Sequence, residues 1–105
     1  NLAIGSFALR YSDEGNRNIA LGSRSQYSNE FGDDNISFGD STLYDNTSGH
    51  KNIAIGKNAL SSNRANENVA IGYGALISTT FSIRFFCHIQ ESSLISKIVS
   101  FLVFS

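Results

Sequence analysis

Proline, methionine and tryptophan are absent from this 105-residue sequence, and cysteine occurs once. A single cysteine, Cys87, cannot form an internal disulfide, so no cross-link compensates for the small core of such a short chain. Charge is sparse and nearly balanced, with 8 Lys and Arg against 9 Asp and Glu. No basic surface is therefore expected, and we predict no nucleic-acid partner. The start at Asn1, without methionine, indicates a fragment or a processed product.

Long apolar runs are also missing. The most apolar stretch, residues 89–104, is interrupted by Glu91 and Lys97 and by several serines. A membrane-spanning helix needs roughly 20 mostly apolar residues, so we predict that this segment does not insert into a membrane.

What the sequence does contain is a repeat. Five glycines follow one another at intervals of 17, 17, 17 and 16 residues: Gly5, Gly22, Gly39, Gly56 and Gly72. The five residues ending at each glycine read NLAIG, NIALG, NISFG, NIAIG and NVAIG. Repetition at a fixed short period is the signature of a solenoid, in which successive copies stack along an axis.

Each block predicts one short strand. Its residues alternate along the chain, are rich in β-branched side chains and lack helical spacing. Turn-rich segments and an Ala-Leu pair separate the blocks, as in Ala59-Leu60. We therefore predict an all-β fold, a parallel β-solenoid of about five 17-residue coils over residues 1–76. Residues 77–105 carry no repeat and form a separate C-terminal segment.

Stacking turns each block position into a column along the axis. The asparagine column is predicted to form a ladder of side-chain amides between coils: Asn1, Asn18, Asn35, Asn52 and Asn68. The large apolar positions are predicted to form the core: Leu2, Ile4, Ile19, Leu21, Ile36, Phe38, Ile53, Ile55, Val69 and Ile71. The small column between them is predicted to face another chain, or alternatively solvent: Ala3, Ala20, Ser37, Ala54 and Ala70.

The blocks resemble the head repeats of trimeric autotransporter adhesins, the YadA-like family, and the N-x-A-I-G-x-x-A-L repeats of phage and large-virus fibres. Residues 18–22, 52–56 and 68–72 match most closely, and the likeness covers residues 1–76. The period of 17 and the Ala-Leu pair favour the fibre variant. The resemblance implies a left-handed β-roll, a homotrimer, and binding to a host-surface protein or glycan. It leaves a bacterial or viral origin open.

The C-terminal segment allows three interpretations. It can be a cap that covers the open edge of the last coil, as solenoids require. It can be an amphipathic helix, since Leu94, Ile95, Ile98 and Leu102 fall at helical spacing. It can also be an unselected peptide, translated from a wrong frame or an unspliced intron.

No motif predicts chemistry. Cys87 and His88 are adjacent, which is not a metal-ligand spacing, and no catalytic triad can be assembled around them. The acidic residues near Asp33 lack the glycine-rich calcium pattern. Asn35 and Asn46 begin glycosylation sequons, of which only Asn46, in a turn, is expected to be accessible. We predict no enzyme activity, no cofactor and no metal site.

The predicted function is a structural or adhesive fibre segment that presents a binding surface on a cell or virion. Its expected location is a cell surface, a virion surface or the secreted space. The alternative is an ice- or mineral-binding β-solenoid, in which flat Ala, Ser and Thr columns would themselves form the binding face.

Overall fold

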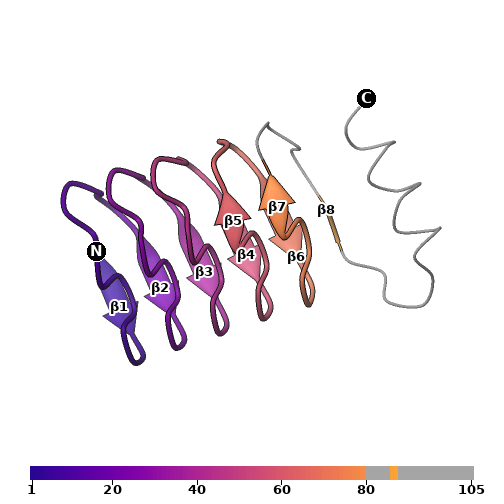
Figure 1. Ribbon diagram of the computed structural model, residues 1–105, viewed down its shortest axis with the longest axis horizontal. Coiled ribbons are helices and arrows are strands. Elements are labelled where there is room, and N and C mark those ends of the chain that lie inside the picture. Colours follow the sequence, from indigo (N-terminus) through magenta and orange to yellow (C-terminus); the bar gives the residue numbers. More distant parts are fainter. Residues whose placement is uncertain (80–85, 88–105) are drawn as a thin grey trace.

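The computed structural model describes residues 1–79 and 86–87, and this part of the chain contains strands and turns without helix. Six short strands form one parallel sheet: β1 (Leu2–Ile4), β2 (Ile19–Leu21), β3 (Ile36–Phe38), β4 (Ile53–Ile55), β6 (Val69–Ile71) and β8 (Phe86–Cys87). A second parallel sheet pairs β5 (Ser62–Asn63) with β7 (Ser78–Thr79). Figure 1 shows the coils stacked along one axis. The prediction of an all-β parallel solenoid is confirmed.

Equivalent residues of successive coils pair in register. The pairing joins Leu2 to Ile19, Ile19 to Ile36, Ile36 to Ile53 and Ile53 to Val69. The step is thus 17 residues three times and then 16, as the glycine spacing predicts. The shorter step arises in one loop, because residues 63–65 take the place that residues 46–49 occupy in the preceding coil.

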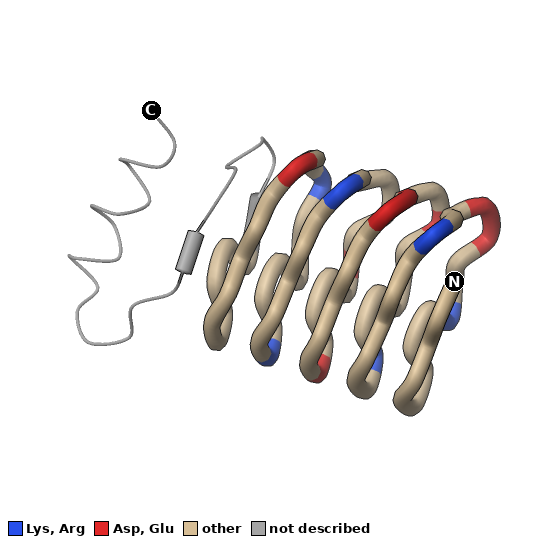
Figure 2. Tube along the Cα trace, turned by 180° about the vertical axis from the view of Figure 1, so that it is seen from behind, with Lys and Arg blue, Asp and Glu red and all other residues tan. Residues whose placement is uncertain are grey.

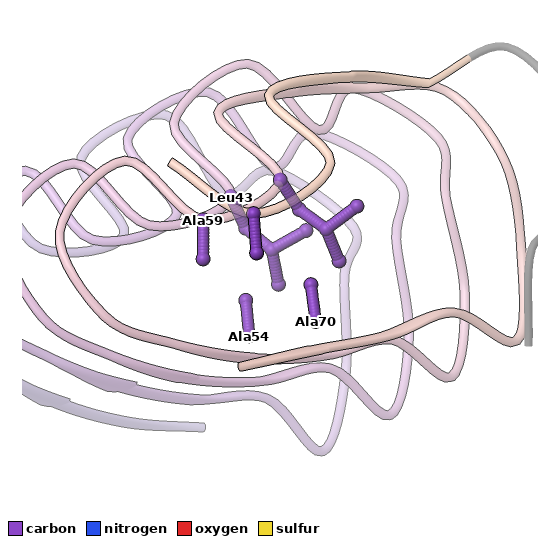
Figure 3. Close-up of a cluster of buried hydrophobic side chains, with 6 residues drawn as sticks. Leu43, Ala54, Ala59 and Ala70 are labelled. Atoms are coloured by element: carbon purple, nitrogen blue, oxygen red, sulfur yellow. The ribbon is translucent and has the colours of Figure 1, made fainter. Parts of the chain in front are cut away.

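The interior lies between two layers of each coil. In Figure 3, Ala54 of β4 and Ala70 of β6 point toward Leu43 and Ala59, which come from the layer opposite the six-stranded sheet. We call this second layer the turn layer; it comprises residues 8–12 and their equivalents in later coils. All four labelled side chains are completely buried. Alanine on one side and leucine on the other therefore fill a thin core.

The two faces of the strands are the reverse of the prediction. The small residues Ala20, Ser37, Ala54 and Ala70 are buried inside the coils, and only Ala3, in the first coil, is exposed. The predicted core residues lie outside and are exposed or half-buried: Leu2, Ile4, Ile19, Leu21, Ile36, Phe38, Ile53, Ile55, Val69 and Ile71. The reason is the alternation of side chains between the two faces of a strand. In a strand, Asn18 and Ala20 share a face, so a buried asparagine brings the alanine inward and sends Ile19 outward.

The turn layer bends through left-handed backbone. Leu43 has φ 48° and Leu60 has φ 50°, and the equivalent positions in the other coils behave alike. Such a conformation costs a non-glycine residue about 1–2 kcal/mol. It allows adjacent residues, such as Ala59 and Leu60, both to be buried. Burial of the leucine side chain, worth about 1.5–3 kcal/mol, offsets the cost.

A glycine ends each strand of the first five coils because the coils approach one another there. Gly22 has φ 128°, a conformation that L side chains rarely adopt. A Cβ atom on Gly22 would also lie 2.5 Å from the carbonyl oxygen of Gly39 in the next coil. Backbone stacks directly on backbone at this corner.

The solenoid backbone continues beyond residue 76. Strand β7 extends the second sheet, and β8 pairs with β6 through Ala70↔Phe86 and Ile71↔Cys87. The start of the segment predicted as non-repetitive therefore follows the same path as the repeats. The three interpretations of the remaining segment concern residues outside the described ones, among them His88 and the proposed helix positions 94–102.

Candidate functional surface

The outer face of the sheet is an apolar surface along the first five of its strands, β1, β2, β3, β4 and β6. We call the Leu, Ile, Val and Phe residues that point outward from β1, β2, β3, β4 and β6 the outer sheet face. Ile4 is 61% exposed, Phe38 58% and Ile55 41%. Soluble monomers rarely expose contiguous apolar patches larger than a few hundred Å². Since the residues stack in register, this face is continuous from β1 to β6.

The predicted asparagine column forms a buried hydrogen-bonded ladder. The Oδ1 atom of Asn35 accepts the backbone N–H of Asn52 at 3.0 Å, and its Nδ2 donates to the carbonyl oxygen of Gly49 at 2.8 Å. Asn18 makes the equivalent bonds, to the N–H of Asn35 and to the carbonyl of Gly32. The side chains bond mostly to backbone, so each amide joins two segments of chain and fixes the corner of its coil.

A second asparagine ladder was not predicted. Asn29, Asn46 and Asn63 are completely buried in the turn layer and lie 17 residues apart. Nδ2 of Asn46 donates to Oδ1 of Asn29 at 2.8 Å, and Nδ2 of Asn63 donates to Oδ1 of Asn46 at 2.7 Å. The equivalent position of the first coil is Ser12, whose buried hydroxyl has no hydrogen-bond partner. The 17-residue spacing of these three asparagines in the sequence could have revealed this ladder.

Burial of Asn46 overturns the expectation that its sequon lies in an accessible turn. Its amide is bonded to Asn29 and to the carbonyl oxygen of Gly49. A Cβ atom on Gly49 would collide with Oδ1 of Asn46, which explains the glycine three residues after the ladder position. Glycosylation of the folded coil would have to break these contacts.

The one polar residue in the leucine column is partly matched by polar neighbours. Gln26 occupies the position that Leu43 and Leu60 hold in later coils and is completely buried. Its Nε2 donates to the carbonyl oxygen of Ile19 at 2.8 Å and to Oγ of Ser37 at 2.9 Å. Ser37 stands where the other coils have alanine, so the two exceptions to the repeat bond to each other. Oε1 of Gln26 is buried without a partner in the described part of the chain.

Residues of alternating charge occupy the position directly before each asparagine of the first ladder, from Asn18 to Asn68. We call Arg17, Asp34, Lys51 and Glu67 the charged corner; Figure 2 shows its blue and red segments alternating along the stack. Nε of Arg17 lies 2.6 Å from Oδ1 of Asp34. Beside them, Nδ1 of His50 accepts the backbone N–H of Asp33 at 3.0 Å. These residues line a hollow of ≈ 340 Å³, but its charges largely neutralise one another.

The Arg17–Asp34 ion pair predicts a lowered pKa for Asp34, which can be tested. The hydrogen bond from Arg17 holds the pKa of Asp34 below its ordinary value of 3.8. The pair therefore stabilises the corner fully above that value, and its contribution is lost as the pH falls through the lowered pKa. We predict that Arg17→Gln raises the pKa of Asp34, measured by a carboxyl NMR titration. The same change at Arg64, which forms no ion pair among the described residues, should leave Asp34 unaffected.

Aromatic side chains gather outside the turn layer of the first three coils. The rings of Tyr27 and Tyr44 stack with centroids 4.8 Å apart and an interplanar angle of 1°. This distance is close to the spacing of neighbouring strands, because the two residues occupy the same position in consecutive coils. Tyr11 and Phe7 meet Tyr27 nearly at right angles, at 5.2 and 6.5 Å. We call Tyr27 and Tyr44 the tyrosine stack.

Within residues 1–79 and 86–87, no three His, Cys, Asp or Glu side chains come together as a metal site would require. No helix that could cross a membrane occurs in the same part of the chain. Comparisons with protein-family models, with curated proteins and with solved structures find no match for this chain.

Proposed function

We propose that this chain is a non-catalytic, structural segment of a surface fibre, in which identical chains pack side by side and present a binding surface. The fibre would stand on a cell or a virion, or be secreted. The observation that carries the proposal is the outer sheet face, a straight apolar surface that spans all five repeat strands. Three chains per assembly is the number that the resemblance to adhesin and fibre repeats suggests.

The composition of the outer sheet face supports self-association. Obligate interfaces between identical chains resemble a domain core cut in half, with large aliphatic and aromatic side chains. The core inside the coils is poor by comparison, because its strand side consists of alanine and one serine. Burying the outer leucine, isoleucine and phenylalanine side chains against other copies would add roughly 25 cal/mol for each Å² of apolar surface covered.

The contact surface proposed here differs from the one predicted from sequence. The small column Ala3, Ala20, Ser37, Ala54 and Ala70 was expected to face another chain, but four of its five members are inside the coil. Their burial also argues against the ice- or mineral-binding alternative. The Ala, Ser and Thr columns that it needs on the surface, including Thr42 and Ala59, are completely buried from the second coil on.

Sedimentation of the 105-residue chain tests the proposal. We expect an oligomer at micromolar concentration that is dissociated by Ile55→Asp, because the charge would be placed in the middle of the outer sheet face. Circular dichroism on the same samples reports whether the strands persist. Ser48→Asp introduces the same charge at an exposed loop and should leave the oligomer intact.

Two results would overturn the proposal. One is a wild-type chain that sediments as a folded monomer at these concentrations. The other is an Ile55→Asp variant that still assembles, which would show that the outer sheet face is not the contact.

A further inference from the structure

The tyrosine stack ends at Tyr44, which has one ring face that no other aromatic ring covers. One face of Tyr44 is covered by Tyr27, and its other face is turned toward the next coil. The equivalent position in that coil is Ser61, which has no ring to continue the stack. Tyr27, in contrast, has neighbours on both sides, since Tyr11 and Phe7 approach it from the first coil. Tyr44 is thus the member of the stack whose face is available.

A hollow of ≈ 290 Å³ lies beside this open face. Apart from Tyr44, all the residues that line it are polar: Arg24, Ser41, Asn58, Ser61 and Ser62. This volume is near the lower end of the range of about 300–1,000 Å³ found for small-molecule sites. The hollow therefore accommodates one ring-sized group.

Several polar groups of the hollow have hydrogen-bonding capacity to spare. The side chains of Asn58 and Ser62 form no hydrogen bond within the described part of the chain. Arg24 makes one long contact, with its Nη2 atom 3.5 Å from Oδ1 of Asp40. Ser41 is bonded only to the same carboxylate, at 3.2 Å. An amide, two hydroxyls and a guanidinium thus belong to residues that line a space next to an aromatic face.

We propose that this hollow binds a pyranose ring of a carbohydrate, stacked on Tyr44 and hydrogen-bonded by Asn58, Ser62 and Arg24. The C–H face of a pyranose packs on an aromatic ring, and its hydroxyls supply both donors and acceptors at the rim. An aromatic side chain of a protein partner would fill the stacking position but leave the polar groups unpaired, which is unfavourable.

The site is compatible with assembly through the outer sheet face. Tyr44 is only half-buried and lines the hollow, so its ring lies on the outside of the turn layer. The turn layer lies across the core from the six-stranded sheet (Figure 3). The inference deepens the proposed function by naming a ligand class, and it rests on that function only for its biological setting.

The test is saturation-transfer NMR of the 105-residue chain with methyl glycosides of glucose, galactose, mannose and N-acetylglucosamine. We expect transfer to the ring protons of at least one glycoside, with shifts of the backbone amides of Asn58, Ser61 and Ser62. Tyr44→Ala should weaken binding tenfold or more, whereas Tyr44→Phe should retain it because the ring face remains. Tyr73→Ala removes an exposed tyrosine outside the hollow and should have no effect.

The Ser61→Tyr variant is the most direct test of the binding site. A third ring at this position would continue the tyrosine stack and occupy the ligand's place, so binding should be lost while the melting temperature stays the same or rises. The proposal is overturned if no glycoside binds, if Ser61→Tyr binds as well as wild type, or if p-cresol binds in the hollow and the glycosides do not. Sedimentation of the same samples reports separately on the assembly, so either idea can fail without the other.

Discussion

Replacing Ala54 with arginine should unfold the solenoid. Ala54 is completely buried and packs in the cluster formed by Leu43 and Leu60, where there is neither room nor a partner for a guanidinium group. Burying an unpaired charge costs several kcal/mol, and the whole stability of a small domain is about 5–15 kcal/mol. We expect loss of the β-sheet circular dichroism signal at room temperature, or a melting temperature lowered by tens of degrees.

The matched control is the same substitution at the next residue. Ile55 is 41% exposed on the outer sheet face, and the stem of an arginine can lie along that surface with its charge in water. Ile55→Arg should therefore keep the strand signal, even though it should dissociate the assembly. If Ile55→Arg unfolded the chain while Ala54→Arg did not, the assignment of inner and outer faces would be wrong.

Replacing Asn35 with leucine should have the second largest effect. The side chains have similar size, but leucine cannot accept the backbone N–H of Asn52 or donate to the carbonyl oxygen of Gly49. A buried N–H without an acceptor costs about 1–3 kcal/mol, and each further bond lost adds about 1 kcal/mol. We expect a loss of about 3 kcal/mol, which lowers the Tm by more than about 10 °C. Urea or thermal unfolding measures it.

Asn16→Leu provides the comparison. The Asn16 side chain is exposed and donates only to the carbonyl oxygen of Glu14, at 2.8 Å. Water can replace that bond, so the change in unfolding free energy should stay within about 0.5 kcal/mol. Equal losses for Asn16→Leu and Asn35→Leu would show that the buried ladder does not stabilise the coils specifically.

Much of the fold follows from local sequence. The glycine spacing gives the step of 17 residues and its single shortening to 16, because each glycine marks the same corner of a coil. The alternation within each block gives a strand, and the asparagine before it gives a ladder. These features depend on residues that are close together in the chain and on the stacking of similar coils. The repeat in the sequence indicates that stacking.

The orientation of the strands was predicted wrongly, although the sequence contained the necessary information. Asn18 and Ala20 occupy the same face of a strand, so a buried asparagine ladder and a core of Ile19 and Leu21 are incompatible. The prediction placed isoleucine in the interior because isoleucine is more hydrophobic than alanine. The interior of a coil is narrow, however, and alanine is the residue that fits between the sheet and Leu43.

The candidate sites depended on contacts that only the tertiary structure supplies. The repeat places Tyr27 and Tyr44 in the same column, but their stacking, and the hollow where Ser61 replaces a ring, depend on how the turn layer directs side chains. Left-handed backbone at Leu43 shifts the in-out order of the residues around it, and simple alternation cannot anticipate this. The sequence by itself determined the solenoid, its period and the asparagine ladder before the strands. The tertiary structure decided which residues fill the core and which lie on the outer sheet face, because the narrow interior of a two-layer coil admits small side chains and excludes large ones.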